Sequence, residues 1–139
     1  DGAVGRMWCY CVNAGDMSSQ HIRIVGSKAS LEWNDMHPDV VKYQVQGQPE
    51  QLLYRGLDYL DPMAQEDERL GALHYTGLIE SWSNLYKRFA VVMAAKDRGD
   101  EETVKNVIYP DLEHGIDGIK WIDACAESAD KGAVWVDVK

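Results

Sequence analysis

The side chains able to bind a metal or act as nucleophiles are few in this sequence, and they do not cluster. The cysteines Cys9, Cys11 and Cys125 form no Cys-x-x-Cys pair, and no two of the four histidines stand four residues apart. Three cysteines are an odd number, which does not suit a disulfide framework, and the spacings typical of a zinc site are missing, so neither is indicated. Cys9 and Cys11 stand two apart in an apolar run, and we expect them to be buried structural thiols on one face of a strand.

One segment is long and irregular enough to carry a site. Residues 56–75, GLDYLDPMAQEDERLGALHY, follow no sustained period and contain Pro62 and Gly71. Long connections are uncommon in compact domains and often carry function. We therefore place any site of this chain in that segment, with one short helical turn inside it. Its acidic run EDER, residues 66–69, is interpreted as a solvated face.

The residues before this segment predict a sheet. Runs rich in β-branched and aromatic residues are separated by turns of a few residues, and they fall at 4–12, 22–26, 30–33, 40–45 and 51–54. Short connections favour a meandering, largely antiparallel sheet. A last strand is expected at residues 133–138.

Two long helices are predicted after the segment. In the first, over residues 76–99, Thr76 is the expected N-cap, Gly99 is the stop signal, and the apolar side chains recur three and four apart. This expected core stripe consists of Leu78, Ile79, Trp82, Leu85, Tyr86, Phe89 and Met93. In the second helix Asp111 is the expected cap and Gly132 the terminator. Its expected stripe consists of Leu112, Ile116, Ile119 and Ile122, while Gly115 and Gly118 suggest close approach of a neighbouring element.

This order of elements predicts an α+β fold, an open, mostly antiparallel or mixed sheet with two long helices packed on one face. The other face would carry Trp8, Tyr10, Trp33 and Tyr43. Because large apolar patches rarely stay in contact with water, we expect a homo-oligomer that forms through this open face of the sheet.

Composition narrows the class of protein. The chain has 139 residues, 45% of them hydrophobic, which fits a single domain able to bury a core. A formal charge of −9 argues against nucleic-acid binding. No apolar run is long enough to span a membrane and no signal peptide is visible, so we expect a cytoplasmic protein without a membrane partner. The opening Asp-Gly is typical of a hairpin turn, which suggests that the chain begins inside a longer protein.

Three stretches together resemble the carboxyl-terminal domain of the glucose-fructose oxidoreductase and inositol dehydrogenase family, Gfo/Idh/MocA, a dihydrodipicolinate-reductase-like fold. They are HIRIVGSKASLEW, the pattern Y-x-x-x-x-E-S-W-S-N-L-Y-K-R-F from Tyr75 to Phe89, and DLEHGIDGIKWIDACAESADKGAVWVDV. The resemblance covers nearly the whole chain, from Gly2 to Val138.

The resemblance implies a parent protein with an amino-terminal Rossmann domain that binds NAD or NADP. Residues 1–139 would be its truncated C-terminal substrate and oligomerisation domain. No Gly-x-Gly-x-x-Gly fingerprint is present, so we expect this chain to bind no cofactor by itself. The family's catalytic lysine and its Asp-x-x-x-His pair have no match either. Asp35 and His37 stand only two apart and are given no catalytic role.

The resemblance also points to His74 and Tyr75 as substrate contacts. Relatives carry a His- and Tyr-containing stretch before the first long helix, and GALHYTG keeps both residues at a different spacing. An imidazole and a phenol suit hydrogen bonding to sugar or polyol hydroxyls. The alternative is a histidine that only caps or solvates the start of the helix.

Two functions remain open. In the first, the chain is part of an NAD(P)-dependent oxidoreductase that acts on a sugar, polyol or related small molecule, and it supplies a substrate wall and the oligomer interface. In the second, it is a stand-alone, non-catalytic module for dimerisation or ligand binding. By itself the chain is expected to be inactive in both cases.

Overall fold

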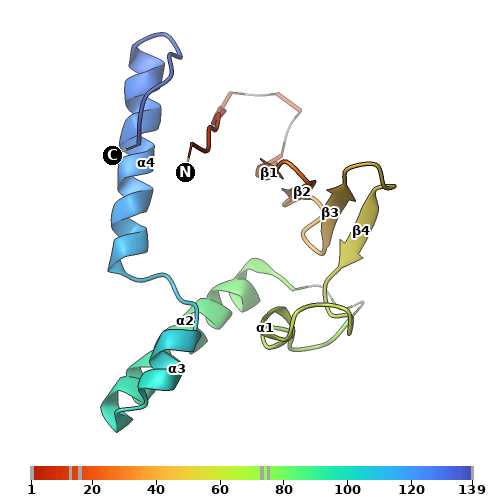
Figure 1. The fold of residues 1–139 in the computed structure, drawn as a ribbon, viewed down its shortest axis with the longest axis vertical. Helices are drawn as coiled ribbons and strands as arrows, with labels where there is room; N and C mark the ends of the chain where they lie inside the picture. Colours follow the sequence, from red (N-terminus) through yellow and green to blue (C-terminus); the bar gives the residue numbers. More distant parts are fainter. Residues whose placement is uncertain (1, 13, 16, 73, 75, 139) are drawn as a thin grey trace. The chain divides into compact units, whose positions relative to one another are not determined.

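The chain forms two compact units in its computed structural model, which describes residues 2–12, 14–15, 17–72, 74 and 76–138 (Figure 1). The first, called here the sheet unit, is Val12–Ser81. The second, the helical unit, joins Asp1–Cys11 to Trp82–Lys139. Each is described by itself. The expectation that residues 1–139 form a single domain stays a prediction.

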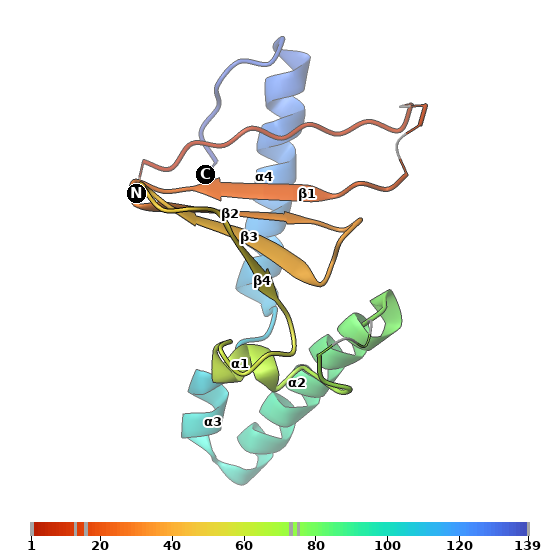
Figure 2. The ribbon, with the colours of Figure 1, turned by 90° about the vertical axis from the view of Figure 1, so that its right-hand side faces the viewer.

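The sheet unit contains a four-stranded antiparallel meander with the strand order β1-β2-β3-β4 (Figure 2). Its strands are β1 (His21–Val25), β2 (Ala29–Asn34), β3 (Val40–Val45) and β4 (Gln51–Tyr54). The first turn is closed by the Gly26 N–H, which donates to the Ala29 carbonyl at 2.9 Å, and Gly47 supplies the positive φ of +78° in the last turn. These are the strands predicted for residues 22–54, within one residue at each end.

The register gives the sheet two chemically different faces. Trp33 lies opposite Ile22 on one side and Val41 on the other. The next such row is apolar over Ile24, Leu31 and Tyr43 and ends in Gln51 of β4. We call this the apolar face, and it consists of Ile22, Ile24, Leu31, Trp33, Val41, Tyr43 and Leu53. Its members alternate along each strand with the residues of a charged face.

Glu32 is the centre of the charged face. Its Oε1 lies 3.3 Å from Lys42 Nζ and 3.4 Å from His21 Nε2, and its Oε2 lies 3.9 Å from Arg23 Nε. The hydrogen bond from Lys42 is the main cause that lowers the pKa of Glu32 below its usual range, with a smaller contribution from His21. The two faces together explain why apolar and polar residues alternate along β2 and β3.

Four helices follow the sheet, two of them long. They are α1 (Pro62–Gln65), α2 (Leu78–Arg98), α3 (Glu101–Asn106) and α4 (Leu112–Asp130). The short α1 is the helical turn expected in the irregular segment, whereas α3 was not predicted. Asp100 caps α3 through its carboxylate, which accepts from the Thr103 N–H at 3.0 Å and from the Thr103 hydroxyl at 2.7 Å. These two contacts lower the pKa of Asp100.

The start of α2 differs from the prediction by one residue. Gly77, and not Thr76, occupies the cap position, because the Gly77 carbonyl accepts from the Ser81 N–H at 3.1 Å. The Gly77 N–H in turn donates to Glu80 Oε2 at 3.1 Å, which is the reciprocal half of a capping box. The glutamate therefore satisfies the N–H of the cap residue, which is a different contact from the one expected of a threonine cap.

Two predicted strands are absent from the described residues. Neither 4–12 nor 133–138 has strand structure, and Cys9 and Cys11 are exposed and not buried. The physical reason is that a strand exists only where a neighbouring strand accepts its backbone hydrogen bonds, and propensity alone does not supply that neighbour. The prediction of buried thiols depended on the first of these strands and was wrong with it.

The predicted helix stripes are apolar but exposed. All seven members of the α2 stripe and all four of the α4 stripe remain exposed, while the buried side chains of these helices are Asn84, Val92, Ala95 and Ala124. A period identifies which face is apolar, whereas burial needs a surface that covers it. Among the described residues nothing lies within 4 Å of a Cβ built on Gly115 or Gly118, so the close approach expected there is not observed. The packing of both helices on one face of the sheet stays a prediction.

The helices of the described residues include none that combines the length and the apolar character needed to cross a membrane.

Candidate functional site

The candidate site lies in the connection between β4 and α2. The connection is irregular but ordered by its own contacts. The Tyr59 hydroxyl donates to the Tyr54 carbonyl at 2.9 Å, and the Gln65 side chain donates to the Leu60 carbonyl at 2.7 Å. At α1 the Asp61 carboxylate accepts from the Met63 N–H at 2.9 Å, which is the usual N-cap contact ahead of a proline at the first helical position. These contacts fold the first half of the connection back onto the end of β4.

Arg55, the residue directly after β4, binds three segments at once. Its Nε donates to Asp39 Oδ1, its Nη1 donates to Glu68 Oε2 at 2.5 Å, and its Nη2 donates to the His74 carbonyl. The side chains of Arg55, Asp39 and Glu68 are only 19%, 23% and 15% exposed. The guanidinium therefore joins the entry of β3, the middle of the connection and its last residues. We call these four residues the arginine clamp.

The guanidinium of Arg55 is stabilised in its charged form. Burial by itself opposes the charge of Arg55, but the hydrogen bond to Asp39 and the charges of Glu68 and Asp39 outweigh it and raise the pKa of the guanidinium. An arginine is already protonated at any pH at which proteins fold. Arg55 is therefore a permanent donor, and it cannot act as an acid or base.

Gly56 adds a second contact between the two ends of the connection. Its φ is +73°, and a Cβ built on it would lie 2.7 Å from the Ala72 nitrogen and 2.9 Å from the Gly71 carbonyl carbon. Both the backbone conformation and the lack of space favour glycine. The residues next to Arg55 and those just before His74 thus lie in backbone contact.

His74 is exposed at the end of this closed connection. Its Nδ1 lies 3.2 Å from the Ala72 carbonyl oxygen, which can only accept a hydrogen bond. In that contact Nδ1 carries the proton, so Nε2 of the neutral ring is an acceptor. Such a nitrogen can accept from a substrate hydroxyl. Tyr75, the second predicted contact, lies outside the described residues.

The clamp was not predicted from the sequence. Asp39 is the last residue of the DMHPD stretch, in which Asp35 and His37 were considered and set aside, and Glu68 belongs to the run interpreted as a solvated face. For Glu68 that interpretation was wrong, because an arginine 13 residues earlier pairs with it. No local pattern links residues 39, 55, 68 and 74. The only signal was an Arg-Gly pair at the end of a strand.

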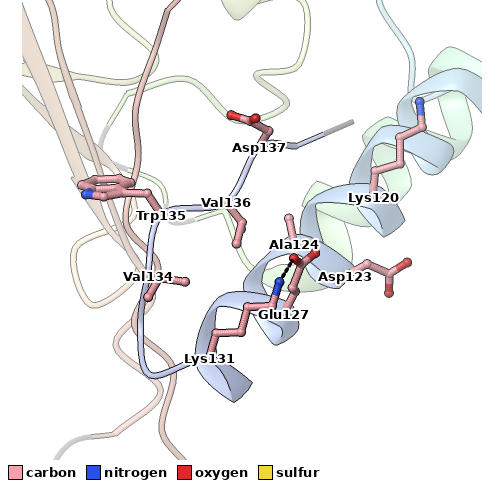
Figure 3. A pocket seen from close by; sticks show the side chains of 9 residues that line it. All are labelled: Lys120, Asp123, Ala124, Glu127, Lys131, Val134, Trp135, Val136 and Asp137. Atoms are coloured by element: carbon pink, nitrogen blue, oxygen red, sulfur yellow. Dashed lines mark hydrogen bonds and ion pairs between the residues drawn. The ribbon is translucent and has the colours of Figure 1, made fainter.

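A hollow lies on the helical unit, between α4 and residues 134–137 (Figure 3). It has a volume of about 440 Å³ and is lined by Lys120, Asp123, Ala124, Glu127 and Lys131 as well as the tail. It carries charges of both signs: Lys131 Nζ lies 2.6 Å from Glu127 Oε1, and Lys120 Nζ lies 3.7 Å from Asp117 Oδ1 outside the lining. The Arg6 guanidinium lies 5.3 Å from the centre of the Trp135 ring. Nothing in this lining selects a ligand of one charge, and we place the candidate site in the clamped connection.

Within the part of the chain that the structure describes, no three His, Cys, Asp or Glu side chains form a group that could hold a metal ion.

Known proteins resemble the chain over nearly its whole length. Residues 1–138 match the Gfo/Idh/MocA family described as "Oxidoreductase family, C-terminal alpha/beta domain". "Uncharacterized oxidoreductase YfiI" of Bacillus subtilis (strain 168) is 54% identical over all 139 residues, which cover 35% of its own length.

Solved structures agree. An inositol dehydrogenase homolog of Azotobacter vinelandii in complex with NADH and myo-inositol is 52% identical with a TM-score of 0.79, over 91% of this chain and 33% of that one. An oxidoreductase of Pseudomonas syringae is 49% identical with a TM-score of 0.80, over 90% of this chain and 34% of that one. The chain thus spans about a third of the length of these relatives. Match, identity and fold together show that the chain belongs to the Gfo/Idh/MocA oxidoreductase family, in which it corresponds to the C-terminal α/β domain.

Proposed function

We propose that this chain is the substrate-side and oligomerisation domain of a two-domain, NAD(P)-dependent oxidoreductase that acts on a polyol or sugar. The observation that carries the proposal is the exposed His74 at the end of a connection closed by Arg55 and Gly56. The similarity to a protein solved with NADH and myo-inositol supports a hydroxyl-rich substrate. In this role His74 Nε2 accepts a hydrogen bond from one substrate hydroxyl, and Tyr75 is the second contact.

The nicotinamide cofactor, NAD or NADP, is assigned to another part of the parent protein. A dinucleotide site needs a strand, a glycine-rich turn and a helix that opens toward the diphosphate. In the described residues the four strands follow one another directly, and none leads through such a turn into a helix. The residues of this chain therefore do not fit the cofactor. Their part is to bind and orient the substrate, which helps catalysis by fixing the reacting carbon near the hydride acceptor.

The apolar face of the sheet supports the oligomerisation role. Ile22, Ile24 and Leu31 are each more than 40% exposed on it. A twofold interface pairs one patch with the same patch of a second copy, so a single apolar face can supply both halves of the interface. We therefore propose that the homo-oligomer forms through this face. Of the four aromatic residues expected on it, Trp33 and Tyr43 lie in the sheet, whereas Trp8 and Tyr10 lie outside its strands.

The test of the substrate role uses the full-length protein that contains this chain. We expect NAD-dependent oxidation of myo-inositol or a related polyol, and we expect His74→Ala to lower kcat/KM for the polyol about tenfold, the cost of one lost hydrogen bond. His37→Ala is the matched control, because His37 is also an exposed histidine of the sheet unit. Equal activity of the two variants would contradict the role of His74.

The second candidate is the stand-alone module, and the apolar face is the observation that favours it. In this case the native protein would have about the size of this chain and would dimerise without any oxidoreductase activity. Immunoblotting of the source cells distinguishes the two. If the protein is a two-domain enzyme, the band should have at least about twice the mass of this chain. A band near the mass of the chain supports the module.

A further inference from the structure

We propose that Arg55 is a positioning residue for the substrate, which sets the location of His74 through the arginine clamp. This inference rests on the proposed substrate role of His74. It assigns a function to a side chain whose contacts in the structure are with Asp39, Glu68 and the His74 carbonyl.

The first argument is the number of separate segments that Arg55 joins. Asp39 is bound twice, because the Arg55 N–H donates to the Asp39 carbonyl at 3.0 Å in addition to the side-chain contact. This double contact fixes Arg55 to the entry of β3, which belongs to the sheet. The other end of the guanidinium reaches the His74 carbonyl 19 residues further along the chain. The backbone of His74 is thereby tied to the sheet through one side chain.

The second argument is the shape of the donor. Three acceptors in three directions match the planar fork of a guanidinium, which presents five N–H groups in fixed geometry. A lysine ammonium has a similar charge but cannot reach Asp39, Glu68 and the His74 carbonyl from one rigid plane. The clamp therefore depends on the identity of Arg55 and not only on its charge.

The third argument is independent of charge. Gly56 brings its own backbone against Ala72 and Gly71, so the two ends of the connection meet even without the guanidinium. The glycine contact brings the two ends of the connection together, and the arginine contact fixes the position of its last residues before α2. A displacement of about 1 Å in a substrate contact is enough to lower the rate of an enzyme substantially.

The experiment measures kcat and both KM values of the full-length enzyme with a polyol that it oxidises. We expect Arg55→Lys to raise KM for the polyol about tenfold while KM for the nicotinamide cofactor stays unchanged. Arg23→Lys is the matched control, since Arg23 also lies in the sheet unit but is exposed, with its Nε 3.9 Å from Glu32. Equal changes in both KM values, or equal effects of the two variants, would overturn the inference.

A double-mutant cycle separates positioning from a general structural role. If Arg55 acts through His74, Arg55→Lys adds less than about threefold to polyol KM in the His74→Ala background. A full tenfold effect in that background would show that Arg55 acts elsewhere. If His74→Ala alone changes nothing, the role of His74 and the clamp both fail. If His74→Ala raises KM but Arg55→Lys does not, only the clamp fails.

A milder variant covers the case in which Arg55→Lys does not fold. Asp39→Asn keeps the carbonyl that binds the Arg55 N–H and removes only the carboxylate charge. It is expected to raise polyol KM by about threefold, less than Arg55→Lys, again without effect on cofactor KM. An unchanged polyol KM in this folded variant would overturn the inference.

Discussion

The clamped connection and helix α4 are ordered in opposite ways. The connection has almost no regular structure, yet Arg55 and Gly56 fix both of its ends through contacts with residues 13 to 19 positions away in the chain. Helix α4 is regular over 19 residues, yet only Ala124 is buried within it. Order in the first region comes from distant partners, and order in the second comes from neighbours along the chain.

The ends of α4 show how local that second kind of order is. At the start, the Asp111 carboxylate accepts from the His114 N–H at 3.0 Å. At the end, Gly132 has a φ of +84°, the Ala133 N–H donates to the Ser128 carbonyl at 2.7 Å, and the Gly132 N–H donates to the Ala129 carbonyl at 3.1 Å. This is the Schellman pattern, which needs no residue outside the helix end. Substitutions in the two regions are therefore expected to differ in size and even in sign.

Gly56→Ala is expected to have the largest effect. It combines a strained positive φ with a Cβ placed 2.7 Å from backbone, and we expect the free energy of unfolding to fall by about 3 kcal/mol. Gly71→Ala is the control, since Gly71 has a φ of +74° but nothing within 4 Å of its Cβ, and only about 1 kcal/mol is expected. Urea unfolding of the full-length protein gives both values. Equal losses would show that the close approach at Gly56 contributes nothing.

Arg55→Ala comes next. It leaves two largely buried carboxylates without their cation, and we expect a loss of about 2 kcal/mol in the same assay. In Arg55→Ala/Glu68→Gln one of the unpaired charges is removed as well, so part of the loss should be recovered. A double variant that is less stable than Arg55→Ala would contradict the pairing of these residues.

Gly118→Ala in α4 is expected to act in the other direction. A Cβ at this position meets nothing within 4 Å, so the gain in helix propensity of about 1 kcal/mol should appear as added stability. The same change at Gly115 serves as a replicate. A loss of stability in both would mean that a neighbour covers this side of α4, and the contrast with Gly56 would disappear.

The smallest effect is expected from Asp111→Ala, and it should depend on pH. Hydrogen bonds from the His114 N–H and side chain lower the pKa of Asp111 in the folded state. A depressed pKa means that the stabilisation is present above the unfolded value and is lost as the pH falls through the folded value. Asp111→Ala should therefore lower Tm most at neutral pH, and the loss should shrink as the pH falls through the folded pKa. Asp111→Asn, which keeps an acceptor, should lower Tm less. A Tm difference that persists in acid would argue against the carboxylate cap.

The same contrast explains what the sequence revealed. Strands β3 and β4 and the cap and terminator of α4 were predicted at the correct residues, because alternation and capping are local patterns. Helix α3 was overlooked since its six residues are too few to establish a period. The clamp was not predicted, because the pairing of Arg55 with Asp39 and Glu68 exists only after the chain has folded. The expected strand at 4–12 was wrong for the related reason that its pairing partner is not encoded locally.

The meander of the sheet has a consequence for how the protein folds. Each strand pairs with the next one along the chain, over turns of a few residues. Contacts between sequence neighbours need little loop closure, and chains rich in them fold fast. A slip of one residue between β2 and β3 would place Glu32, in place of Leu31, opposite Tyr43. A charged side chain would then lie on the apolar face, which makes the wrong register costly. The sheet is thus expected to form early in folding and in the correct register. The contacts of Arg55 with distant residues are expected to form later.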